Sequence, residues 1–102
     1  MILTREEALN YHRQMWSDMR NALGDNPGGY ERIRFKEMWC AKHFPYEYIS
    51  NSCFLCEYAG NNSDSGCCLI DWPNGRCVTH AYYYTAPISE ILALPERKEN
   101  KV

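Results

Sequence analysis

The feature that most constrains this chain is a cluster of cysteines in its second half. Five of the six cysteines fall between residues 53 and 77. They form a Cys-x-x-Cys pair, then two adjacent cysteines, then a single one. Two cysteines separated by two residues can turn back onto one metal ion, and Zn²⁺ is held tetrahedrally by thiolates in this way. The spacing therefore predicts a structural zinc site.

The ligands of this site are not equally well defined by the spacing. Adjacent side chains at 67 and 68 point in different directions, so one is expected to bind the metal and the other to pack. A Pro-Asn-Gly turn at 73–75 is placed to bring the last cysteine back to the cluster. The expected ligands are Cys53, Cys56, Cys68 and Cys77, with Cys67 and His80 as alternates and the Cys40 and His43 pair as outside candidates.

Other roles of the cysteines are less well supported. Two disulfides would need an oxidising compartment and would leave one thiol over. A redox Cys-x-x-Cys pair usually begins a helix in a βαβ unit, which the sequence pattern lacks. The cysteines could also pack as small apolar side chains without metal. A closed site with four protein ligands would stabilise the fold rather than catalyse a reaction.

The first half of the chain is predicted to begin with a long helix over residues 4–23. Thr4 and Glu7 have the spacing of a capping box. Apolar residues then recur at the helical repeat, so Trp16 and Met19 are expected in the core.

A second helix is expected over about 30–43, after a turn at 24–29 that is rich in Gly, Asn and Pro. Its apolar positions Tyr30, Ile33, Met38 and Ala41 lie near one face, with Phe35 and Trp39 in a neighbouring stripe. Because the connection is short, the two helices are expected to pack antiparallel, as a helical hairpin over residues 4–43.

The second half is expected to be rich in loops. Its predicted elements are short extended segments at 46–50 and 78–85 and one short helix at 86–95. The predicted fold is a small α+β domain over 1–95, in which the hairpin packs on a zinc-stapled half at 46–95 with short strands. Residues 96–102 are expected to form a solvated tail.

Charge and hydrophobicity narrow the class of protein. The formal net charge is −2, a poor match to proteins that grip phosphate backbones with a strongly basic face. No apolar stretch approaches the roughly 20 residues of a membrane span, and the first residues do not have the pattern of a signal peptide. We therefore expect a cytoplasmic protein without a membrane partner. Thiols stay reduced in the cytoplasm, which favours metal over disulfides.

Four stretches spread over most of the chain form a set: "LTREEALNYHRQMWSDM", "NSCFLCEYA", "CLIDWPNGRC" and "ILALPER". With these stretches in this order, the chain resembles small cysteine-rich proteins encoded in phages and prophages of Firmicutes. That group has a Cys-x-x-Cys-Glu-Tyr stretch, which residues 53–58 match. The group then has a second Cys-x-x-Cys followed by Trp-Pro, and Cys68, Trp72 and Pro73 match its latter part.

This chain departs from the group at Ser65, where the third cysteine would fall. Cys67 or Cys77 must then supply the missing ligand. The resemblance implies a phage origin and action in the cytoplasm of a bacterial host. It does not imply an activity.

The sequence lacks the motifs of an enzyme. His12, His43 and His80 lie on separate predicted elements, and His12 falls on the apolar stripe of the first helix. A zinc-deaminase signature, a His-Glu-x-x-His helix and a Gly-rich phosphate loop are all missing from the sequence. We therefore predict a non-enzymatic protein.

The predicted function is that of a zinc-stabilised protein-interaction module of phage type. Such a module would inhibit a host bacterial protein, for example a defence factor, in the manner of an anti-CRISPR, or a replication factor. The expected partner-binding residues are Tyr82, Tyr83 and Tyr84. In a strand one of these rings faces opposite to the other two, and Tyr is favoured at interfaces. Alternatively, helices cover both faces of this segment.

The alternative function is a zinc-knuckle protein that binds nucleic acid or regulates transcription. Its carriers would be the cations of residues 31–42, with aromatic residues between them: Arg32, Arg34, Lys36 and Lys42. Glu31 and Glu37 lie in the same stretch, which is also the pattern of an ordinary solvated helix face. The oligomeric state is left open by the sequence.

Overall fold

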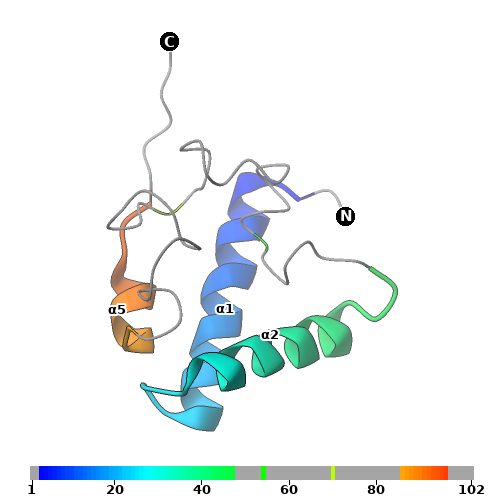
Figure 1. The fold of residues 1–102 in the computed structure, drawn as a ribbon. Coiled ribbons are helices and arrows are strands. Elements are labelled where there is room, and N and C mark those ends of the chain that lie inside the picture. Colours follow the sequence, from blue (N-terminus) through cyan, green and yellow to red (C-terminus); the bar gives the residue numbers. More distant parts are fainter. Residues whose placement is uncertain (1–2, 48–53, 55–69, 71–85, 97–102) are drawn as a thin grey trace.

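The structure is a computed structural model and describes residues 3–47, 54, 70 and 86–96 (Figure 1). Of these residues 71% are helical, Phe54 included, and the described helices are Arg5–Leu23 (α1), Gly29–His43 (α2) and Ile88–Ala93 (α5). The described residues form no strand, only an isolated antiparallel bridge between Ile70 and Glu96. The predicted α+β class with short strands is therefore wrong, because the described part of the chain is helical.

The start of the first predicted extended segment shows why that prediction failed. The amide of Glu47 donates to the carbonyl of Phe44 at 3.2 Å, which closes a turn over residues 44–47. Pro45 stands at the second position of this turn, where its fixed φ favours turning. Residues 48–50 and 78–85, the rest of the predicted strands, lie outside the described residues.

Helix α1 begins and ends as its sequence predicts. Thr4 Oγ1 accepts a hydrogen bond from the amide of Glu7 at 3.1 Å, and the Glu7 carboxylate accepts one from the amide of Thr4 at 2.9 Å. This is the predicted capping box. The helix ends at Gly24, whose positive φ of 86° suits a residue without a side chain. Trp16 and Met19 are buried, as expected.

Helix α2 also forms close to its predicted limits, but it does not run antiparallel alongside α1. The axes of two antiparallel helices look parallel in any view. In Figure 1 the axes of α1 and α2 instead cross at a steep angle. The two helices diverge from the turn that joins them, although Trp39 Nε1 still donates to Asp18 of α1 at 2.8 Å. The two helices are therefore splayed apart, and they do not form the predicted antiparallel hairpin.

An aromatic cluster fills the space between the diverging helices. Phe54, buried and located outside both helices, packs against Tyr11 of α1 and against Trp39 and Phe44, with ring centroids 5.3, 5.6 and 5.7 Å away. Tyr11 and Phe44 also meet edge to face at 5.1 Å. Such ring pairs stabilise a core beyond the area that they bury. Phe54 therefore holds the opened hairpin in place.

Helix α5 is shorter than predicted and is fixed from the α1–α2 turn. Its first residue, Ile88, is buried, and the amide of Ile88 donates to the carbonyl of Asp25 at 2.8 Å. The carboxylate of Asp25 accepts hydrogen bonds from the amide and the hydroxyl of Ser89 at 2.7 and 2.8 Å. These hydrogen bonds lower the pKa of Asp25, and Arg20 at 3.1 Å adds to this effect. A residue 64 positions away thus caps α5.

Candidate functional site

The predicted metal site falls almost entirely outside the described residues. This is true of Cys53, Cys56, Cys67, Cys68, Cys77 and His80, and also of the predicted partner contacts Tyr82, Tyr83 and Tyr84. Of the outside candidates, Cys40 is buried on α2, while the exposed ring of His43 stacks on Trp39 at 3.9 Å. Among the described residues, no three His, Cys, Asp or Glu side chains are grouped as metal ligands.

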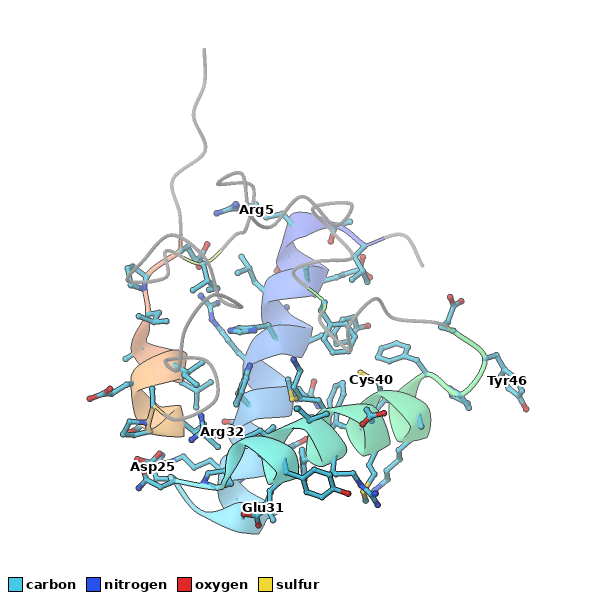
Figure 2. All side chains as sticks on the ribbon, viewed as in Figure 1. Arg5, Asp25, Glu31, Arg32, Cys40 and Tyr46 are labelled. Atoms are coloured by element: carbon cyan, nitrogen blue, oxygen red, sulfur yellow. The ribbon has the colours of Figure 1, made fainter. Side chains whose placement is uncertain are left out.

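The most informative surface in the described structure is the side of α2 that faces solvent. Tyr30, Ile33 and Met38 are 71%, 43% and 62% exposed, although an apolar face is the side that a helix normally buries. The residues that α2 buries are instead Arg32, Lys36, Trp39 and Cys40. In Figure 2, Arg32 and Cys40 point toward the body of the molecule, whereas Glu31 points away from it.

The buried side of α2 is cationic. Arg32 is completely buried and donates from Nε to the carbonyl of Pro27 at 2.9 Å. Lys36 is buried with its ammonium 6.0 Å from the ring centre of Trp16, within reach of a cation–π interaction. Guanidinium and ammonium groups carry long aliphatic stems, which can pack as apolar surface against α1. The interior therefore accepts these two charged residues where the sequence pattern favours apolar ones.

His12 of α1 lies in this same region and is buried. Burial first of all, together with the neighbouring positive charges of Lys36 and Arg13, lowers its pKa from the ordinary 6.5 to about 3. The imidazole is therefore neutral at physiological pH. The burial of His12 agrees with its place on the apolar stripe of the first helix in the sequence.

The solvent-facing side of α2, here called the outer face, consists of exposed residues at helical spacing: Tyr30, Glu31, Ile33, Arg34, Glu37, Met38, Ala41 and Lys42. Arg34 donates to the hydroxyl of Tyr30 at 3.3 Å, and its guanidinium carbon lies 5.9 Å from the centre of that ring. Beyond the end of the helix, Tyr46 is 98% exposed and points away from the molecule in Figure 2. The outer face is thus apolar at several positions and carries two acidic and two basic side chains.

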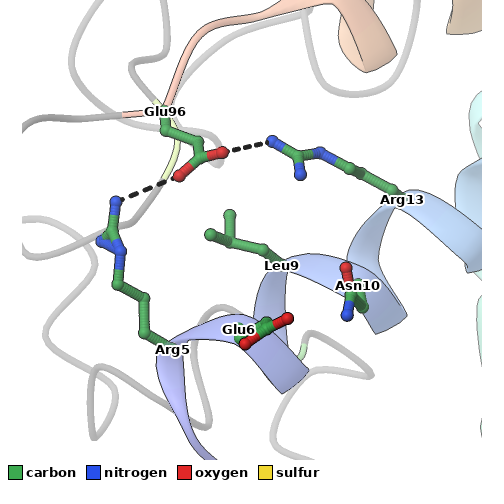
Figure 3. Close-up of a pocket in the computed structure, with 6 residues that line it drawn as sticks. All are labelled: Arg5, Glu6, Leu9, Asn10, Arg13 and Glu96. Carbon is green, nitrogen blue, oxygen red and sulfur yellow. Dashed lines mark hydrogen bonds and ion pairs between the residues drawn. The ribbon is translucent and has the colours of Figure 1, made fainter.

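A small pocket of about 280 Å³ lies beside the first turns of α1 (Figure 3). Arg5 and Arg13 line it, and both point at Glu96, whose carboxylate oxygens lie 3.2 and 2.8 Å from their guanidinium nitrogens. The hydrogen bond from Arg13 is the main reason why the pKa of Glu96 is lowered. Both cations thus contact a carboxylate of the chain itself, and Glu96, the first residue of the predicted tail, is tied to α1.

The basic residues that would carry nucleic-acid binding do not share a surface. Arg34 and Lys42 are exposed, whereas Arg32 and Lys36 are buried on the opposite side of α2. Phosphate contacts need cations that reach the solvent side of a helix. Two of the four expected carriers are therefore withdrawn from any nucleic acid that approaches α2.

Comparison with known proteins gives this chain no relatives. No family model matches it, and no curated protein or solved structure is significantly similar. Among the described residues, no helix has the length and apolar character needed to cross a membrane.

The sequence did not identify the outer face as a functional surface, because apolar residues at helical spacing do not show whether their face is buried or exposed. A signal was present in the sequence. A second face of this helix is formed at helical spacing by Arg32, Lys36 and Trp39, so either face could have been the buried one. Which face is buried depends on the side chains that surround the helix in the fold.

Proposed function

We propose that the protein is a non-enzymatic protein-interaction module that binds its partner through the outer face of α2. The observation that carries this proposal is the exposure of Tyr30, Ile33 and Met38 on one side of a single helix. Neighbouring exposed apolar side chains with a polar rim are typical of interaction sites. Tyr and Met are also enriched in protein interfaces relative to the rest of a protein surface.

The arrangement resembles a helix prepared for docking. An amphipathic helix that binds a protein places anchors at successive turns, at spacings of three, four and seven residues. Tyr30 and Ile33 are three residues apart, and Met38 lies eight residues after Tyr30, about two turns along the helix. Helix α2 is held from behind by Trp39 and the buried Arg32. A rigid helix loses little conformational entropy when it binds, which favours affinity.

The partner class follows from charge and from the resemblance of the sequence. The withdrawal of Arg32 and Lys36 from the surface weakens the alternative of a nucleic-acid-binding or transcription-regulating protein. The resemblance to phage-encoded proteins supports a protein of a bacterial host as the target, with inhibition of a defence or replication factor as the biological outcome. A structural Zn²⁺ bound by the cysteines between 53 and 77 remains part of this proposal.

The proposal can be tested by affinity capture from a bacterial host lysate with Met38→Glu as the test variant. Gln14→Glu, which introduces the same charged residue at an exposed position of α1, is the matched control. We expect the captured protein to be lost with Met38→Glu and kept with Gln14→Glu, and the purified partner to bind with the same pattern. Equal capture by all three proteins, or capture only of nucleic acid in the same eluate, would contradict the proposal.

A further inference from the structure

A second pair of metal-binding residue types lies at the C-terminal end of α2. Cys40 and His43 have two residues between them, and so do Cys53 and Cys56 further along the chain. Two pairs of Cys or His residues with this internal spacing are a common sequence pattern of structural zinc sites. The adjacent cysteines at 67 and 68 do not continue this pattern.

The ring of His43 is oriented as in a metal-binding histidine. Its Nδ1 lies 2.9 Å from the carbonyl oxygen of Trp39, and because a carbonyl only accepts, Nδ1 carries the proton of this hydrogen bond. The neutral imidazole then has its lone pair on Nε2, the atom that binds a metal. Metal-binding histidines almost always donate from their other nitrogen in this way. Stacking on Trp39 at 3.9 Å also restrains the ring.

Cys40 lies on the same side of α2, close to one turn before His43. Side chains three positions apart on a helix are neighbours, with Cβ atoms about 5–6 Å apart. Zinc bonds of about 2.3 Å to a thiolate and about 2.0 Å to an imidazole allow two such neighbours to share one ion. Cys40 is only 8% exposed and points toward the body of the molecule in Figure 2.

Phe54 brings the Cys-x-x-Cys segment to this end of α2. Its ring packs against Trp39 and Phe44, and it belongs to the same buried core cluster as Cys40. Cys53 directly precedes Phe54, so covalent geometry keeps the Cα atoms of these two residues about 3.8 Å apart. The chain that carries the first two expected zinc ligands is therefore anchored beside the end of the helix.

We propose that the structural zinc joins α2 to the cysteine segment and is bound by Cys40, His43, Cys53 and Cys56. Three thiolates and one imidazole are a usual ligand set of closed structural zinc sites. This inference rests on the zinc site in the proposed function: it keeps the first two ligands of that site and takes the other two from α2. The metal then also fixes the helix whose outer face binds the partner.

Zinc competition with a chromophoric chelator tests the ligand set. His43→Gln changes an exposed side chain, so α2 should stay folded, as circular dichroism checks, while zinc binding weakens by about 100-fold because one of four ligands is lost. Cys40→Ser should weaken binding at least as much. The matched controls, which should bind zinc as the wild-type protein does, are Cys68→Ser, Cys77→Ser and His80→Gln. Unchanged binding by His43→Gln would overturn the proposal.

Cobalt substitution gives a second readout, which does not depend on a loss of binding. Thiolate ligands give Co²⁺ a strong absorption in the near ultraviolet, which grows with the number of thiolates. His43→Cys should therefore keep the metal and raise this absorption, because a fourth thiolate replaces the imidazole. His80→Cys, the matched control, should leave the absorption unchanged. A rise with His80→Cys and none with His43→Cys would contradict the proposed ligands.

The outcomes for this inference and for the proposed function can be told apart. Zinc that is lost with Cys68→Ser and Cys77→Ser, and kept with His43→Gln, would remove only the inference and leave a structural zinc in place. A wild-type protein without zinc would overturn both the inference and the zinc in the proposed function. Binding of a partner by the outer face is judged separately, by the capture experiment with Met38→Glu.

Discussion

His12 shows how a single buried residue couples this fold to pH. Its imidazole lies among Trp16, Lys36 and Arg13, where burial and the two positive charges all favour the neutral form. In the unfolded chain the same imidazole titrates near its ordinary pKa of 6.5. The folded state therefore resists protonation at a pH where the unfolded state accepts a proton.

We predict that acidification destabilises the wild-type protein through His12. The folded pKa is depressed, so its contribution to stability is present above pH 6.5 and is lost as the pH falls toward about 3. Between pH 7 and pH 5 the loss should be about 2 kcal/mol. Urea unfolding at both pH values measures it.

His12→Gln removes the titrating group and should lose much less stability over the same interval. The pKa values of Asp25 and Glu96 are lowered from ordinary values near 4. Both carboxylates therefore affect the free energy of unfolding mainly below pH 5, outside this interval. An equal loss of stability in the Gln variant would show that His12 is not the group responsible.

At the scale of the elements, two contacts from distant parts of the sequence set the arrangement of the helices. Phe54 occupies the space between α1 and α2, and Asp25 in the turn caps α5 through Ser89. Neither contact is visible in the local pattern of the element that it fixes. The open angle between the first two helices is therefore a property of what lies between them.

We predict that Phe54→Ala lowers the free energy of unfolding by roughly 3–5 kcal/mol, as large truncations in a core do. The reason is that Phe54 is buried among Tyr11, Trp39 and Phe44. Phe54→Leu keeps an apolar side chain of similar reach and should lose less than half as much. Urea unfolding followed by tryptophan fluorescence gives both values. A loss of under about 1 kcal/mol for the Ala variant would mean that Phe54 does not hold the two helices apart.

At the scale of the whole molecule, the position of Phe54 links the helical half to the proposed zinc site. Phe54 lies between Cys53 and Cys56 in the sequence, so the chain next to a proposed metal ligand is anchored in the helical core. A structural metal contributes its binding energy to folding when its ligands are not arranged beforehand. Zinc at this position would therefore stabilise the helices as well as the cysteine segment.

We predict about one equivalent of zinc per chain in protein purified without added metal. Removal of the zinc by a chelator should lower the melting temperature of the helical signal in circular dichroism, because the segment that carries Phe54 loses its staple. Cys53→Ser should reproduce this effect, while Ser17→Ala, at an exposed position of α1, should not. A metal content near zero, together with thiol titration that shows paired disulfides, would refute the zinc hypothesis.

The sequence alone determined the features that depend on neighbours within a few positions. The capping box of Thr4 and Glu7, the stop at Gly24 and the buried stripe of α1 all follow from local hydrogen bonding and helical periodicity. These could be predicted because α1 has one dominant apolar face, so that burial and periodicity agree. The limits of α2 followed from local signals in the same way.

Only the tertiary structure decided which face of α2 is buried and how α2 lies against α1. The helix has apolar residues on one side and Arg32, Lys36 and Trp39 on the other, and hydrophobicity alone favoured the wrong side. The choice depends on what α1 offers: an aspartate for the indole of Trp39, an aromatic ring near Lys36, and, in the turn, a carbonyl for Arg32. Because these partners come from other elements, no local pattern in α2 could specify them. The exposed outer face, and with it the candidate site, is a consequence of that choice.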